Sequence, residues 1–390
     1  MFPERFSNLP AYAFPRLRAL LDTHAPGGAV VNMTIGEPKH PFPDWVPEVL
    51  AASVGELNNY PPSDGTPELL DAISGWVARR YNVTLGPERL MMLNGSKEGL
   101  YNAAMALLPE LKAGKTPTVL MPNPFYQVYM IGALSVGAKP VFVPAIRQNG
   151  FLPDYGALPQ ETLNRATAAY ICSPANPQGA IADRAYWRDL IALAEKHDFR
   201  IFSDECYSEI YRGDTPTGIL EVAEEMGADP ERIVVFQSLS KRSNLPGLRS
   251  GFLAAGPESI KRLRQLRAYS GAAVPLPLQR VSERAWSDED HVIANRHLYQ
   301  EKFAEADRIF DGVPGYQGPE GGFFLWLPVQ DSEQAALDLW TKTGIRVLPG
   351  AYLSREVEND NPGKPYIRVA MVAPKEEMAQ ALITLRNHLY

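Results

Sequence analysis

A lysine that follows a strand-like segment is the residue of this chain best placed to do chemistry. Lys241 comes shortly after the apolar run 233–236, with Ser238 and Ser240 before it and Arg249 eight residues after it. A lysine amine forms a Schiff base with an aldehyde, while hydroxyls and a guanidinium bind a phosphate dianion. These residue types therefore suit an aldehyde cofactor that carries a phosphate group.

A second anion-binding segment lies upstream. Gly95, Ser96 and Lys97 come directly before a helical pattern with Leu100 and Leu107 on one face. The first turn of a helix offers free backbone N–H groups and the positive end of the helix dipole. The segment alone is equally typical of a simple helix cap, so it gains meaning only together with the other motifs.

Three further segments place polar or aromatic side chains after apolar runs. Tyr126 follows the run 118–121, Asn176 follows 168–172, and Asp204 with Tyr207 ends or follows 200–203. A tyrosine there can stack on an aromatic ring, and a carboxylate at the end of a buried strand needs a cationic partner. A protonated pyridine nitrogen is such a partner.

The elements that must position these residues alternate along the middle of the chain. The apolar runs 118–121, 141–143, 168–172, 200–203, 233–237 and 251–254 are separated by helical patterns such as 184–197. This alternation predicts a mostly parallel sheet that is covered on both faces. Because the carboxyl ends of parallel strands open into one crevice, the candidate residues are expected to meet there.

The two ends of the chain predict a separate α+β lobe. Residues 14–21 and 335–343 have helical patterns, and 346–348 and 366–371 have strand patterns. The proline-containing segment 271–277 marks the expected boundary, and a helical segment over 283–310 is expected to connect the lobes. We therefore predict a large domain over 46–274 and a small domain built from 1–45 and 275–390.

From Ile35-Gly36-Glu37-Pro38 to Tyr366-Ile367-Arg368-Val369, the ordered motifs resemble the class I/II aminotransferases of the aspartate-aminotransferase-like superfamily. The resemblance implies the fold type I α/β architecture, with a mostly parallel seven-stranded sheet in the large domain and a smaller α+β domain. It also implies pyridoxal 5'-phosphate as cofactor and no metal. An amino acid and a keto acid are the implied substrates, and a homodimer with shared active sites is the implied assembly.

The resemblance also implies a role for each matching residue. Lys241 forms the Schiff base, Asp204 pairs with the ring nitrogen, and Tyr207 with Asn176 bonds the ring hydroxyl. Tyr126 stacks on the ring, and Arg368 with Gly36 holds the substrate α-carboxylate, next to Asn176. The phosphate ligands implied are Gly95, Ser96, Lys97, Ser238, Ser240, Arg249 and, from the neighbouring subunit, Tyr60.

Several segments resemble the succinyldiaminopimelate aminotransferases of the bacterial lysine pathway, among them 36–40, 122–127, 203–210 and 238–251. This resemblance implies glutamate as amino donor and N-succinyl-2-amino-6-oxopimelate as acceptor. Lys39, His40 and Arg242 are candidates for binding the distal arm of that substrate, although each also fits a solvated loop charge. The open alternatives are another class I aminotransferase, for aspartate, an aromatic amino acid or kynurenine, and a C–S lyase on the same fold.

Composition narrows the function classes. The 390 residues are 45% hydrophobic and 21% charged, as is usual for a globular protein, and the net charge is −7. An acidic chain without a helix-turn-helix pattern argues against nucleic-acid binding and against a pyridoxal-dependent transcription regulator. The chain shows neither a secretory signal nor a membrane-length apolar run, which predicts a cytoplasmic protein. Cys172 and Cys206 are expected to pack as small core residues rather than to pair.

Overall fold

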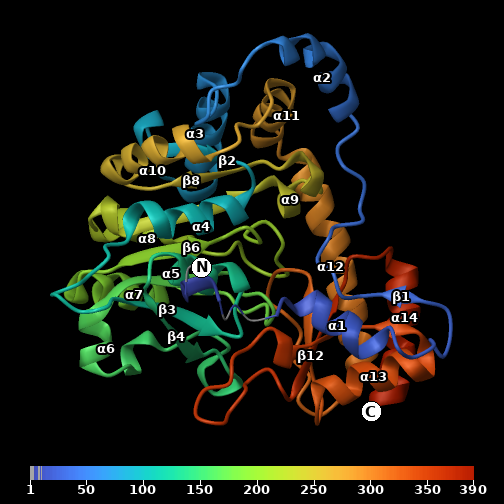
Figure 1. The fold of residues 1–390 in the computed structure, drawn as a ribbon. Helices are drawn as coiled ribbons and strands as arrows, with labels where there is room; N and C mark the ends of the chain where they lie inside the picture. The colour runs from blue at the N-terminus through green and yellow to red at the C-terminus, as the bar shows by residue number, and fades with distance from the viewer. Residues whose placement is uncertain (1–3, 8, 10) are drawn as a thin grey trace.

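The fold is described from a computed structural model, which covers residues 4–7, 9 and 11–390. The chain forms a large seven-stranded sheet, a three-stranded sheet and a two-stranded parallel pair (Figure 1). Residues 1–3, 8 and 10 of the predicted small-domain segment 1–45 lie outside the described residues.

The large sheet has the strand order β2-β8-β7-β6-β5-β3-β4. Strands β3 to β7 pair in parallel, whereas β8 runs antiparallel to both β2 and β7. The predicted mostly parallel seven-stranded sheet is thus confirmed. Its strands are β2 (Leu90–Leu93), β3 (Thr118–Asn123), β4 (Lys139–Pro144), β5 (Ala166–Cys172), β6 (Arg200–Asp204), β7 (Ile233–Ser238) and β8 (Gly251–Ala254).

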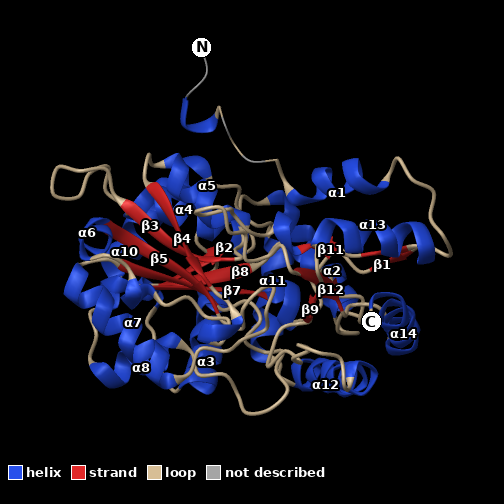
Figure 2. Ribbon diagram, turned by 90° about the horizontal axis from the view of Figure 1, so that it is seen from below, coloured by secondary structure: helices blue, strands red, loops and turns tan. Residues whose placement is uncertain are grey.

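Helices cover both faces of this sheet, as Figure 2 shows. One face packs on α4 (Ser96–Leu107), α5 (Gln127–Ser135) and α10 (Pro257–Ser270). The other packs on α3 (Pro67–Tyr81), α7 (Arg184–His197), α8 (Ile219–Met226) and α11 (Leu276–Ser287). Because strands β2, β3, β5 and β7 are buried along their whole length, their sequences are apolar without alternation. Shorter helices are α2 (Val46–Ser53), α6 (Gln160–Arg165) and α9 (Leu239–Arg242).

Local signals fix where several of these helices begin and end. Helix α7 begins after Asp183, whose carboxylate accepts a hydrogen bond from the backbone N–H of Tyr186 at 2.8 Å. It ends where Asp198 adopts a left-handed conformation with φ 54°. These boundaries, 184–197, agree with the predicted helix.

The second lobe is built around the antiparallel order β11-β12-β9. It contains β9 (Phe324–Pro328), β11 (Leu348–Pro349), β12 (Tyr366–Ala370), α12 (Asp290–Phe310), α13 (Ser332–Thr343) and α14 (Lys375–Leu389). From the N-terminal end, α1 (Ala13–Leu21) packs on Trp340 of α13, and β1 (Val31–Asn32) pairs with β10 (Ile345–Arg346). Segments from both ends of the chain therefore share this lobe (Figure 1).

The structure corrects two local predictions and adds two strands. The predicted strand 346–348 is two short strands, β10 and β11, which join different sheets on either side of Val347. The predicted continuous helix over 283–310 divides at Asp288 and Glu289, where the Asp288 carboxylate accepts a hydrogen bond from the backbone N–H of Asp290, the first residue of α12, at 3.0 Å. Strands β2 and β9 were not predicted. Among the described residues, no helix is long and apolar enough to cross a membrane.

Candidate active site

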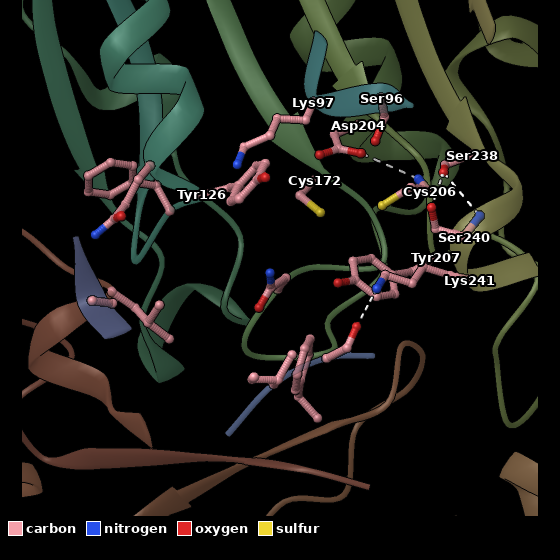
Figure 3. Close-up of a pocket in the computed structure, with 18 of the residues that line it drawn as sticks. Ser96, Lys97, Tyr126, Cys172, Asp204, Cys206, Tyr207, Ser238, Ser240 and Lys241 are labelled. Carbon is pink, nitrogen blue, oxygen red and sulfur yellow. Dashed lines mark hydrogen bonds between the residues drawn. The ribbon is translucent and has the colours of Figure 1, made fainter. Parts of the chain in front are cut away.

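A pocket of about 610 Å³ lies between the carboxyl ends of the large sheet and the second lobe (Figure 3). Strands β5, β6 and β7 each deliver side chains to it directly or just after they end. The predicted residues that line it are Gly36, Ser96, Lys97, Tyr126, Asn176, Asp204, Tyr207, Ser238, Ser240, Lys241, Arg249 and Arg368. The structure thus brings together residues that are up to 332 positions apart in the sequence, Gly36 and Arg368.

Lys241 projects into this pocket from the short helix α9. Its Nζ donates a hydrogen bond to the backbone oxygen of Gly36 and lies 5.3 Å from the centre of the Phe323 ring. Burial lowers the pKa of Lys241 to about 8, and the positive charges of Arg368 and Arg249 act in the same direction. Lys241 therefore has a substantial neutral fraction near neutral pH, as a nucleophilic or basic amine requires.

Asp204 ends β6 and is only 4% exposed. Its Oδ2 accepts a hydrogen bond from the Tyr129 hydroxyl at 2.8 Å, and its Oδ1 accepts one from the Cys206 backbone N–H at 3.4 Å. Burial raises the pKa of Asp204, while these two donors and the nearby Lys241 lower it. The carboxylate is thus held in one orientation but lacks a charged hydrogen-bond partner, so a protonated ring nitrogen fits beside it.

An anion cradle lies at the start of α4 and around α9. The Ser238 hydroxyl lies 3.0 Å from that of Ser240 and accepts the Ser240 backbone N–H at 3.1 Å. Gly95 precedes α4 with φ 76°, and a side-chain carbon there would meet the Arg249 guanidinium at 2.2 Å. Hydroxyls, a guanidinium and a free helix start are the groups that bind a phosphate dianion, so these residues fit pyridoxal phosphate.

Arg368 on β12 supplies a second buried cation, only 6% exposed. Its guanidinium donates to Asn176 Oδ1 at 3.0 Å and to the Thr34 backbone oxygen at 2.8 Å, and it lies 4.1 Å from the centre of the Phe324 ring. Burial lowers its pKa to about 10, which still leaves it charged at neutral pH. No carboxylate among the described residues pairs with this arginine, so a carboxylate of a ligand can.

Aromatic and sulfur side chains complete the walls. Tyr126 lies beside the pocket, and its ring packs edge-on against that of Tyr129, 5.8 Å away. Cys172 and Cys206 are unpaired, as expected, but both line the pocket rather than only the core. Burial raises the pKa of each thiol, so both are protonated at neutral pH.

Some predicted residues lie elsewhere. Tyr60 is fully exposed and does not line the pocket within the described chain. Lys39 is exposed and pairs with Glu37 at 2.9 Å. Arg242 is buried between Trp76 and Trp286 and pairs with Glu289 at 3.0 Å, so it stabilises the large domain and cannot reach a substrate arm. His40 packs on Tyr299 instead of facing the pocket.

Other lining residues were not predicted. They come from the N-terminal segment and the second lobe, and include Tyr12, Phe14, Phe324, Leu348 and Leu353. Their sequence context is ordinary apolar packing, which carried no signal of a site. Tyr129 also lines the pocket and was not predicted, but here the sequence did carry a signal. It follows Tyr126 by three positions at the start of α5, and this spacing places both side chains on one side of the helix.

Comparisons with known proteins agree with this geometry. The sequence profile of the family "Aminotransferase class I and II" matches residues 29–385. The chain is 31% identical to an LL-diaminopimelate aminotransferase of Dehalococcoides mccartyi, over 98% of each chain. It is 32% identical to one of Desulforudis audaxviator, over 99% of this chain and 97% of the relative.

Solved structures agree as well. An aminotransferase from Neisseria meningitidis has a TM-score of 0.94 and 38% identity over 100% of both chains. The aminotransferase AspB from Helicobacter pylori has a TM-score of 0.91 and 33% identity, over 98% of this chain and 99% of that one. The predicted fold type I architecture is confirmed. The chain belongs to the class I and class II aminotransferases, a family of enzymes that depend on pyridoxal 5'-phosphate.

Proposed function

We propose that this aminotransferase exchanges an amino group between glutamate and a keto acid of the diaminopimelate type, N-succinyl-2-amino-6-oxopimelate. The observation that carries the substrate class is the similarity to LL-diaminopimelate aminotransferases over nearly the whole chain. The succinylated form is supported by the motifs at 36–40, 122–127, 203–210 and 238–251. The second candidate is the unsuccinylated acid, 2-amino-6-oxopimelate, which would give LL-diaminopimelate as product and which the similarity to LL-diaminopimelate aminotransferases favours.

The proposed roles follow from the position of each group. Arg368 binds the substrate α-carboxylate through two parallel hydrogen bonds, with Asn176 and the backbone of Gly36 beside it. Bound pyridoxal phosphate supplies an aldehyde that takes up the amino group and a ring that accepts electrons from the substrate Cα. Lys241 Nζ then removes the proton from Cα, since a pKa of about 8 suits a base at neutral pH.

The remaining residues hold the cofactor in this proposal. Asp204 keeps a proton on the ring nitrogen, and Tyr207 and Asn176 bond the ring oxygen. Tyr126 covers one ring face. The phosphate is bound by Ser238, Ser240, Arg249 and the start of α4 at Gly95, Ser96 and Lys97.

Lys97 is the cation best placed to bind the distal carboxylate of such a substrate. Its side chain lines the pocket and lies 6.0 Å from the centre of the Tyr12 ring. No carboxylate among the described residues forms an ion pair with it. Lys39, in contrast, is already paired with Glu37 outside the pocket.

Steady-state kinetics with single keto acids test the substrate. A site that pairs a charged arm rejects analogues that lack it, so kcat/KM for the succinylated acid should exceed that for oxaloacetate and phenylpyruvate by about two orders of magnitude. Faster turnover of the unsuccinylated keto acid, 2-amino-6-oxopimelate, than of its succinylated form would select the second candidate. Turnover of oxaloacetate or phenylpyruvate as fast as either diaminopimelate compound would contradict the substrate class.

The role of Lys97 is tested by a matched pair of variants. Lys97→Gln keeps the backbone N–H but removes the charge, so it should raise KM for the succinylated acid by about fivefold to tenfold, as expected for a partly exposed ion pair. KM for glutamate should change less. Lys39→Gln is the control and should leave both values unchanged. Equal effects of the two variants would contradict a specific contact at Lys97.

A further inference from the structure

Three polar side chains behind the pocket, two of them buried and one half-buried, connect Lys241 to the loop that covers it. They are His40 in the loop, Asn244 in the turn after α9, and Asn295 on α12. We call these three residues the clamp. None of them is among the described residues that line the active-site pocket, and none was predicted to act on Lys241.

The hydrogen bonds of the clamp join three separate segments. Asn295 Oδ1 lies 2.8 Å from His40 Nδ1 and accepts from Asn244 Nδ2 at 3.1 Å. Asn244 Nδ2 also donates to the Pro41 backbone oxygen at 3.2 Å. On its other side, Asn295 Nδ2 donates a long hydrogen bond of 3.5 Å to the backbone oxygen of Lys241.

The orientation of these groups is determined by their partners. The backbone oxygens of Lys241 and Pro41 only accept, so the amide nitrogens of Asn295 and Asn244 must face them. Asn295 Oδ1 is then left as an acceptor, and His40 must present Nδ1–H to it. Burial lowers the pKa of His40, with the charge of Lys302 acting in the same direction, so the ring is neutral at pH 7.

The loop therefore contacts the Lys241 segment at two points. At one end, the Gly36 backbone oxygen accepts from Lys241 Nζ inside the pocket. At the other end, His40 and Pro41 are bound through the two asparagines to the backbone around Lys241. Because His40 follows Gly36 by four positions in the same loop, we expect a shift of the loop at His40 to move the Gly36 oxygen and so to change the environment of the Lys241 amine.

We propose that His40 is a positioning residue for Lys241, acting through Asn295 and Asn244 to hold the amine in the geometry that amino transfer requires. This inference rests on the assignment of Lys241 as the cofactor lysine. His40 does not line the pocket in which the substrate and cofactor are proposed to bind. Its hydrogen bond, rather than its packing against Tyr299, is the feature that matters, although the ring also lies 4.6 Å from the Tyr299 ring.

Two substitutions separate the hydrogen bond from the packing. His40→Asn places an amide nitrogen near the position of Nδ1 but removes the ring, whereas His40→Phe keeps a ring against Tyr299 and removes the donor. His40→Phe should lower kcat by about threefold to tenfold, the effect of one buried hydrogen bond, while KM changes less than about twofold because Arg368 is intact. His40→Asn should restore kcat to within about twofold of the wild type.

Two further readouts do not depend on turnover. In the cofactor-loaded enzyme, the pH midpoint of the visible cofactor band should shift in His40→Phe and return in His40→Asn. In the cofactor-free protein, backbone hydrogen exchange over residues 239–245 should be faster in His40→Phe only. His297→Phe, an exposed position on the same helix α12, is the control and should change nothing.

The outcomes separate the possible failures. A larger loss in His40→Asn than in His40→Phe would show that packing on Tyr299 is what counts and would overturn the proposal. Unchanged kcat, pH midpoint and exchange in His40→Phe would overturn it as well. If exchange responds as expected but borohydride fixes the cofactor to another lysine, the clamp stands and the assignment of Lys241 fails.

Discussion

Burial acts on the acid and the bases of this site in opposite directions. It lowers the pKa of Lys241 to about 8 and that of Arg368 to about 10, and it raises the pKa of Asp204. Each shift favours the neutral form, because charge is disfavoured away from water. For Asp204, hydrogen bonds from the Tyr129 hydroxyl and the Cys206 N–H oppose the effect of burial on the pKa, whereas the hydrogen bond from Lys241 goes to a backbone oxygen.

Residues that carry chemistry were predictable where the cofactor demands a particular type at a strand end. Lys241, Asp204 and Asn176 belong to this class, and the structure brings them to one pocket with Arg368, which lies within β12. The roles assigned to them stay proposals until they are tested. Lys97 was predicted to bind the phosphate through its backbone N–H only. Its side chain also lines the pocket, which was not predictable because the sequence does not determine the direction of an exposed side chain.

Residues that act through packing or through other residues were not predictable. Nothing in the sequence near His40 indicates that Asn295, 255 positions away, is its partner. The expected distal-arm role of Arg242 was wrong for a related reason. Its position beside Lys241 suggested the pocket, but α9 directs it to the opposite side, between two tryptophans.

A helix or strand could be predicted from the sequence where it was long enough to show a regular apolar pattern and where a capping residue marked its end. Helix α7 was predicted to the residue because Asp183 caps it and its apolar face is regular. Strands β10 and β11 are only two residues each, too short for a period to show. Strand β2 was missed because the four residues Leu-Met-Met-Leu show no alternation and fit a buried helix equally well.

The start of α4 allows a prediction at the scale of an element. Gly95→Ala places a carbon 2.2 Å from the Arg249 guanidinium, which must then move away from the cradle. The dissociation constant of pyridoxal phosphate from the cofactor-free enzyme should rise by about tenfold or more, the effect of losing one charge-assisted hydrogen bond. An absorbance titration measures it.

Gly137→Ala is the matched control. Gly137 also has a positive φ, 73°, but a side-chain carbon there meets no atom within 4 Å. Both substitutions force an alanine into a positive φ, and at Gly95 this φ combines with a ψ of 154° in a region essentially restricted to glycine. Cofactor affinity that falls equally in the two variants would show that strain alone is responsible and that Gly95 has no role at the cradle.

For the whole molecule, we retain as proposals the large domain 46–274, the small domain 1–45 and 275–390, and a homodimer with shared active sites. The two lobes have largely separate hydrophobic clusters, but Val281, Ala285 and Trp286 of α11 pack in the cluster of the large sheet, which favours a boundary after α11. The full exposure of Tyr60 supports the dimer, because an aromatic side chain with no contacts of its own is available to a second copy of the chain.

Mixing two inactive variants tests this assembly. If Tyr60 reaches the phosphate of its neighbour, a heterodimer of Tyr60→Ala and Lys241→Ala contains one complete site. Random exchange of equal amounts should restore about a quarter of wild-type activity, since half of the dimers are mixed and each has one intact site of two. Differently tagged subunits would verify the exchange. Complete exchange without recovered activity would contradict a shared site.

The central claim is that Lys241 binds the cofactor covalently. Reduction of the cofactor-loaded enzyme with borohydride, followed by peptide mass spectrometry, tests it most directly. The pyridoxyl group should be found on Lys241 alone, and the Lys241→Ala variant should not be labelled. A pyridoxyl group on another lysine of the wild type, such as Lys97 in the same pocket, would contradict the account.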